Sequence, residues 1–137
     1  MSTVLRPELS EKNKYYISKQ RYYELKHFCL QYHEWKMGLQ ELDIYPRIDN
    51  GERVLIGDVA KPVEMLAEMR GRYLQNMDLV EKTAQEADKD IWKFILIGVT
   101  EGVAYEFLYS RLEIPCSKDI YYDRYRRFFW LLDNARK

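Results

Sequence analysis

Residues 114–132 read IPCSKDIYYDRYRRFFWLL, which brings four basic residues and six aromatic rings into one short stretch. Pro115 bars a helix from running through the start of this stretch, and Ser117 is a typical N-cap. With a helical period of about 3.6 residues, the apolar side chains after Ser117 gather on one side, which we expect to face a core. That side holds Tyr121, Tyr125, Phe128 and Leu132, with Ile120 and Leu131 beside them.

The opposite side of the same helix is polar and is expected to face solvent. It carries Asp119, Asp123, Arg126, Arg127, Trp130, Asp133 and Asn134. A short helix and a tight turn before such a helix give the helix-turn-helix layout, in which the start of the second helix reaches base edges and later arginines contact phosphates. The predicted DNA-binding residues are Ser117, Lys118, Tyr122, Arg126 and Arg127.

Two other interpretations of this helix stay open. Basic residues in late helical turns favourably oppose the helix dipole, and Asp123 and Arg127 are spaced to pair, so the pattern also fits an ordinary solvated bundle helix. Trp130 on the polar side indicates a contact with another helix, a subunit or nucleic acid. Aromatic faces also occur at protein interfaces, which makes Trp130 a candidate partner-binding residue.

Helical periodicity continues upstream. A first helix is expected from Ser18, a suitable N-cap, with apolar residues at steps of three and four. This seam is Leu25, Phe28, Tyr32, Trp35, Leu39 and Leu42. The stretch 43–58 contains Pro46, Asn50-Gly51 and Gly57 and is expected to be a loop, in which the short run RVLI has no partner strand.

A second helix is expected to open at Lys61-Pro62 and to end near Ala87. Its seam is Leu66, Met69, Tyr73, Met77, Val80 and Ala84. Asp88 or Asp90 should cap a third helix, and Thr100 a fourth. The sequence therefore predicts an all-α, five-helix bundle with a C-terminal helix-turn-helix. We expect a single domain over 1–137, with an arm at 1–17, a helical pair at 18–87 and the helix-turn-helix unit at 88–137.

Composition narrows the class of protein. The 137 residues are 47% hydrophobic and 15% aromatic, which excludes a disordered chain. The longest apolar run, FILIGV at 94–99, is too short to span a bilayer, and no signal peptide is evident, so we expect a cytoplasmic protein with no membrane partner. Net charge is zero, while residues 111–137 hold seven basic and four acidic residues, a weak basic excess.

No catalytic or metal-binding motif stands out. Cys29 and His33 share one helical side with His27 nearby, but no second Cys/His pair completes a zinc site. The acidic pairs, Glu101 with Glu106 and Asp88 with Asp90, have no converging His, Ser or Lys. We therefore expect no enzyme activity, no metal and no cofactor. Cys29 and Cys116, isolated in sequence, should be free thiols.

The run from Thr100 to Leu132, TEGVAYEFLYSRLEIPCSKDIYYDRYRRFFWLL, resembles region four of sigma factors and phage late-transcription activators of the RinA and ArpU type. Glu101-Gly102 match the lead-in, Leu112 and Ile114 the turn hydrophobics, and 117–127 the recognition segment. Most of the chain is also similar to small proteins encoded in Firmicutes prophages. The resemblance implies a helix-turn-helix that binds DNA. Glu113 stands at the usual turn glycine and Leu108 at the usual small residue, which implies a left-handed Glu113 and a widened motif.

The leading hypothesis is a phage or mobile-element transcriptional regulator that binds double-stranded DNA. The alternative is a small phage-encoded interaction module or inhibitor that binds a host or phage protein, such as RNA polymerase, through the same aromatic and basic side. The sequence leaves the operator, the partner and the presence of a homodimer open. Salt separates the two hypotheses, because phosphate contacts weaken steeply as salt rises.

Overall fold

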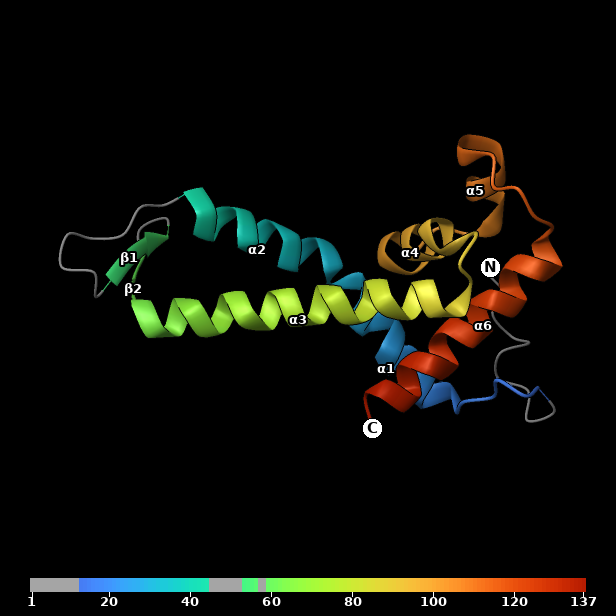
Figure 1. Ribbon diagram of the computed structural model, residues 1–137, viewed down its shortest axis with the longest axis horizontal. Coiled ribbons are helices and arrows are strands. Elements are labelled where there is room, and N and C mark those ends of the chain that lie inside the picture. Colours follow the sequence, from blue (N-terminus) through green and yellow to red (C-terminus); the bar gives the residue numbers. More distant parts are fainter. Residues whose placement is uncertain (1–12, 45–52, 57–58) are drawn as a thin grey trace. The chain divides into compact units, whose positions relative to one another are not determined.

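The structure, a computed structural model, describes residues 13–44, 53–56 and 59–137, and this part of the chain is all-α apart from one small hairpin (Figure 1). The all-α class predicted from the sequence is confirmed. The described elements are α1 Lys19–Leu30, α2 Tyr32–Ile44, β1 Arg53–Ile56, β2 Val59–Pro62, α3 Val63–Ala87, α4 Trp92–Glu101, α5 Tyr105–Leu112 and α6 Lys118–Ala135.

The chain forms two compact units. The first, here called the terminal unit, comprises the described part of 1–30 together with 80–137, and the second, the hairpin unit, comprises 31–79. Helix α3 contributes to both units. This division differs from the expected one, because α1 and the end of α3 belong with the C-terminal helices rather than with a separate helical pair.

Two expectations for the first 62 residues are wrong. The single helix expected from Ser18 is interrupted at Gln31 and forms α1 and α2; nothing in the local sequence, which has neither proline nor glycine, explains the interruption. The run RVLI does have a partner, because β1 pairs antiparallel with β2, with Arg53 opposite Pro62 and Ile56 opposite Val59. The turn signals Pro46, Asn50-Gly51 and Gly57 lie outside the described residues.

In the hairpin unit, α2 and α3 approach closely at Gly38. A Cβ atom there would lie 2.6 Å from Cε2 of Tyr73, so a larger residue would push the ring away. Trp35 and Leu66 are buried, and the predicted seam residues Met69, Tyr73 and Met77 are half-buried. The predicted apolar seam of α3 is therefore its packing side in this unit.

At the junction between α3 and α4, the N-cap of α4 is Ile91 rather than the expected Asp88 or Asp90, and Asp88 instead closes the turn that precedes it. Asp88 Oδ1 accepts hydrogen bonds from the backbone N–H groups of Asp90 and Ile91, at 2.7 and 3.0 Å. The next boundary differs. Thr100 does not start a helix; its hydroxyl donates to the Leu96 carbonyl inside α4. Gly102, with φ of 69°, ends α4 in the left-handed conformation, and α5 begins at Tyr105.

Aromatic side chains of α6 form the core of the terminal unit. The predicted core side is confirmed for Tyr121, Tyr125, Phe128 and Leu132, all of which are buried. Ile120, expected beside them, is 49% exposed instead. Helix α1 packs on α4 and α6, and α4 also packs on α5 and α6.

The segment 13–17 is held against the terminal unit rather than being a loose arm. Tyr15 and Ile17 are buried, and the Tyr15 ring lies 5.7 Å from the Trp130 ring of α6. Asn13 closes a turn by accepting the Tyr15 N–H at its Oδ1, at 2.8 Å. Ser18 then caps α1, as predicted, by accepting the Arg21 N–H.

Helices α4 and α6 come so close at Gly98 that the site has no room for a side chain. A Cβ atom there would lie 2.1 Å from the Tyr121 hydroxyl oxygen and 3.4 Å from Cζ of the same ring. Close contact of α4 with α6 therefore depends on glycine at this position.

We expect Gly98→Ala to destabilise the protein by about 1–3 kcal/mol, the usual cost of overpacking a core. Adding Tyr121→Phe should restore much of this stability relative to Tyr121→Phe alone, because the clashing oxygen is gone. The measurement is urea unfolding followed by circular dichroism. Gly71→Ala on α3, with nothing within 4 Å of its added Cβ, is the control and should be neutral or stabilising. Equal stability of Gly98→Ala and the wild type would contradict this packing.

Candidate nucleic-acid interface

Helices α5 and α6 are joined by residues 113–117. Glu113 adopts the left-handed conformation, with φ of 56° and ψ of 46°, as its place at the turn implied. The connection is fixed by Ile114, which is buried and donates its backbone N–H to the Leu108 carbonyl at 3.1 Å. Leu108 is fully buried, so its bulk is accommodated within the core.

Ser117 and Lys118 lie at the start of α6. Ser117 is the N-cap, and its hydroxyl oxygen accepts the Ile120 N–H at 3.3 Å. Lys118 is exposed, but its ammonium group is 2.7 Å from the Glu106 carboxylate on α5. The hydrogen bond from Lys118 lowers the pKa of Glu106. A DNA contact by Lys118 would have to displace this ion pair.

Tyr122 does not lie on the surface, so the expectation of an exposed side chain there is wrong. It is 6% exposed, and its hydroxyl oxygen accepts the backbone N–H of Tyr105 at the start of α5, at 3.1 Å. Its ring also packs against the neighbouring rings of Tyr121 and Tyr125. Its hydrogen bond to the start of α5 therefore holds this residue in the core.

Arg127 and Trp130 lie on the side of α6 that meets the N-terminal segment, and Arg126 precedes them on the same helix. The side chain of Arg126 is only 14% exposed, and its Nε is buried without a hydrogen-bond partner in the described residues. Arg127 donates from Nη1 to the Tyr15 hydroxyl at 3.3 Å. Trp130, the candidate partner-binding residue, is half-buried against Tyr15 of the same chain.

The charges around the start of α6 nearly balance. Residues 105–124 hold three basic and four acidic residues. Arg124 bonds Asp88 at 2.9 Å and also pairs with Asp123, while Lys118 pairs with Glu106. This end of the expected recognition helix therefore has no excess of positive charge for phosphates.

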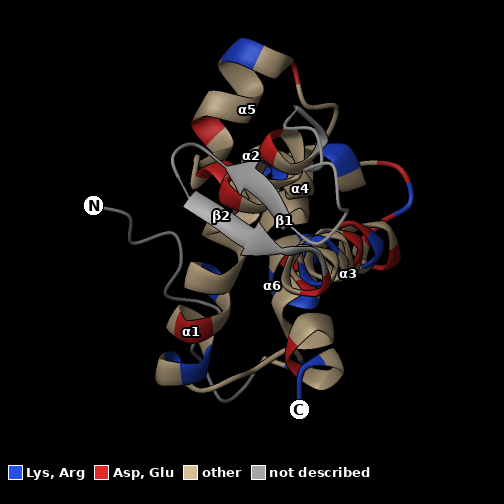
Figure 2. Cartoon of the chain, turned by 90° about the vertical axis from the view of Figure 1, so that its left-hand side faces the viewer, with Lys and Arg blue, Asp and Glu red and all other residues tan. Residues whose placement is uncertain are grey.

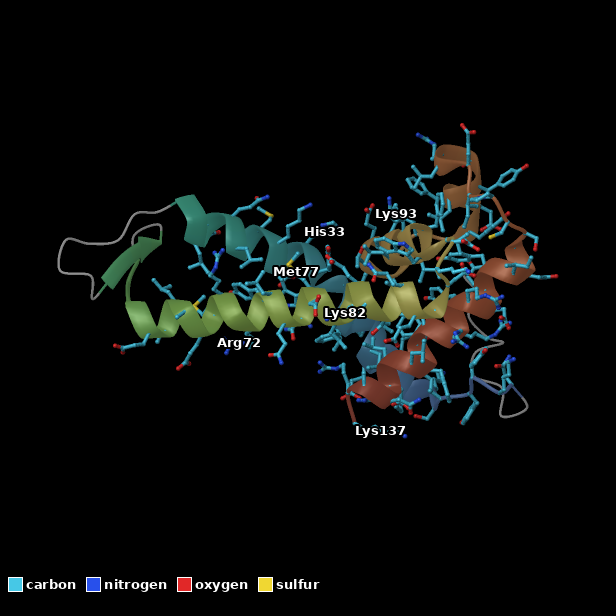
Figure 3. The ribbon with its side chains drawn as sticks, in the orientation of Figure 1. His33, Arg72, Met77, Lys82, Lys93 and Lys137 are labelled. Atoms are coloured by element: carbon cyan, nitrogen blue, oxygen red, sulfur yellow. The ribbon has the colours of Figure 1, made fainter. Side chains whose placement is uncertain are left out.

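The positive charge gathers elsewhere in the terminal unit. Residues 13–30 and 125–137 together hold eight Lys or Arg and two acidic residues, which we call the basic region (Figure 2). Its basic members are Lys14, Lys19, Arg21, Lys26, Arg126, Arg127, Arg136 and Lys137. One of its two carboxylates, Asp133, is bound to Arg21 at 2.6 Å. Lys137 ends the chain just beyond α6 (Figure 3).

Folding brings the two halves of this region together. Arg21 on α1 also donates to the backbone carbonyl of Arg136, at 3.1 Å, and the Arg136 guanidinium stacks 3.7 Å from the centre of the Phe28 ring. Sequence reasoning missed the N-terminal half of the region, because residues 1–17 were expected to be a loose arm. The apolar Ile17 directly before the Ser18 cap was the available signal, since such a residue often fixes the chain entering a helix.

The described residues were also considered for a metal site, a disulfide and a membrane-spanning helix. None of their His, Cys, Asp and Glu side chains form a group of three placed to hold a metal ion. Cys29 and Cys116 are free thiols, as predicted, and burial raises the pKa of both. Among the described helices, none is both long enough and apolar enough to cross a membrane.

In comparisons with known proteins, no family model, no curated protein and no solved structure matches this chain.

The burial of Tyr122 gives a testable consequence. We expect Tyr122→Phe to cost about 1–3 kcal/mol of unfolding free energy, because the buried Tyr105 N–H would be left without its acceptor. Urea unfolding measures it. Tyr109→Phe is the matched control; its side chain is 63% exposed, so removal of its hydroxyl should change stability by no more than about 0.5 kcal/mol. If both variants are as stable as the wild type, the hydrogen bond does not hold α5 in place.

Proposed function

We propose that this protein binds double-stranded DNA and acts as a phage or mobile-element transcriptional regulator. The observation that carries the proposal is the basic region. Its two segments, which pack together in the fold, hold eight basic residues and only two acidic ones. Such a surplus supplies the phosphate contacts that dominate affinity for DNA. The α5–α6 pair supports the same proposal, because its left-handed residue, buried turn hydrophobic and capped second helix are features of a helix-turn-helix.

In this proposal the two parts of α6 have different tasks. The basic second half, with Arg126 and Arg127, contacts the phosphate backbone together with the N-terminal segment. The start of the helix, with Ser117 and Lys118, lies nearer the bases and contributes hydrogen bonds rather than net charge. Tyr122, being buried, orients α5 instead of touching DNA.

We expect Arg126→Ala and Arg127→Ala each to weaken binding to all DNA sequences. Each should also flatten the plot of log affinity against log salt by about 0.9 for every phosphate that the variant no longer neutralises. Fluorescence anisotropy with fragments of the encoding genome region, at several salt concentrations, measures both quantities. Lys93→Ala is the control, since Lys93 extends from α4 outside the basic region (Figure 3). Wild-type protein that binds no fragment even at low salt would overturn the proposal, as would arginine variants that bind like the wild type.

A second candidate function is the protein-interaction module. Four of the eight exposed large hydrophobic residues in the described chain lie within α5 and the start of α6. They are Phe107, Tyr109, Leu112 and Ile120. Exposed apolar side chains among balanced charges suit a protein partner better than a phosphate backbone.

This candidate predicts that Ile120→Glu abolishes binding to a protein partner, for which purified bacterial RNA polymerase is the first probe. The binding should persist as salt rises, because apolar contacts carry it. Leu74→Glu, at a residue of α3 that is 47% exposed, is the matched control. Surface plasmon resonance with both variants tests this candidate; equal binding by the two variants would exclude this surface.

A further inference from the structure

We infer that Lys14, Tyr15 and Arg127 form a site for one phosphate group, in which a guanidinium, a phenolic hydroxyl and an ammonium group converge. The inference rests on the proposed function for the source of the phosphate, a DNA backbone. The site itself is defined by contacts within the chain and can be tested without DNA.

The hydroxyl of Tyr15 is the centre of the site. It accepts a hydrogen bond from Nη1 of Arg127 at 3.3 Å, so its own proton can be donated to an anion. The Lys14 ammonium group lies 5.0 Å from the centre of the Tyr15 ring. Phosphate oxygens are pure acceptors, and three donors that include two cations suit them.

The surroundings hold Tyr15 in position before any ligand arrives. The Tyr15 ring is buried and packs on Trp130, and its backbone N–H is bound to the Asn13 side chain. Arg127 projects from α6, whose core side is buried. Because Tyr15 is held by these contacts and Arg127 is hydrogen-bonded to it, binding a phosphate requires little reordering of these two side chains.

The local charge also favours an anion. The hydrogen bond from Arg127 lowers the pKa of Tyr15, and the charge of Lys14 adds to this effect against the opposing effect of burial. Asp123, one turn before Arg127 on α6, is engaged by Arg124 and lies 4.0 Å from Arg126.

The first experiment uses inorganic phosphate and protein labelled with ¹³C at Cζ of tyrosine. We expect phosphate to shift the Tyr15 NMR signal, assigned by its disappearance in Tyr15→Phe, and to raise the pKa of Tyr15. Chloride at equal ionic strength should have neither effect. Arg127→Gln and Lys14→Gln should each weaken the response. An unmoved Tyr15 signal, or a response unchanged in both variants, would overturn the site.

The second experiment uses DNA. Tyr15→Phe should weaken binding about tenfold, the worth of one hydrogen bond to a charged group, and leave the salt slope unchanged because the tyrosine carries no charge. Lys14→Gln should lower that slope by about one. Tyr109→Phe and Lys93→Gln are the matched controls.

The two experiments separate the inference from the proposed function. If phosphate moves Tyr15 but no DNA is bound, the site takes free phosphate and only the DNA proposal fails. If DNA is bound and both Tyr15→Phe and Lys14→Gln bind it like the wild type, the site is not part of the DNA contact and the inference fails while the DNA proposal stands.

Discussion

The hydroxyl groups of Tyr22 on α1 and Tyr125 on α6 meet 2.9 Å apart in the interior of the terminal unit. Both residues are buried, so removal of either hydroxyl would leave a polar group in the core without this bond. The Tyr22 ring also meets Phe129 edge to face at 5.1 Å. This contact sets how α1 lies on α6, and through it Arg21 reaches Asp133 and the end of the chain. The basic region exists because this aromatic pair brings the two segments together.

Periodicity was sufficient to predict the helical segments and the core side of α6, although not the interruption at Gln31 that divides the first seam into α1 and α2. It did not predict the burial of Tyr122 or the exposure of Ile120, because contacts between helices, such as the hydrogen bond of Tyr122 with α5, decide which side chains are buried. The β1–β2 pair was missed because four-residue strands have no period to detect. Thr100 was predicted to start a helix, and the backbone geometry shows instead that α4 continues through Thr100 and ends at Gly102. Of the candidate site, the sequence predicted the arginines of α6 but not the N-terminal segment, because the burial of Tyr15 depends on contacts with residues distant in sequence.

If α5 and α6 act as a helix-turn-helix, the distribution of charge suggests that affinity for DNA and specificity for its sequence would come from different parts of the protein. In the proposed DNA complex, the start of α6, where charges balance, would contribute little to attraction at a distance, whereas the basic region would attract phosphates whatever the sequence. The Lys118–Glu106 pair is no obstacle to base contacts, because water screens an exposed ion pair and leaves it easy to replace. Glu106 would then hold Lys118 in place until a better acceptor, a base edge or a phosphate, replaces it.

The basic region is also a product of folding rather than of local sequence. Lys14 and Arg127 are 113 positions apart in the numbering, yet both meet the Tyr15 side chain. Holding positive charges together costs Coulomb energy, which the core aromatics and the ion pair of Arg21 with Asp133 offset. A bound anion would relieve the same repulsion, so it should favour the state in which the N-terminal segment lies on α6. Anion binding at the proposed site and the docking of residues 13–17 would therefore be coupled, and each would stabilise the other by the same free energy.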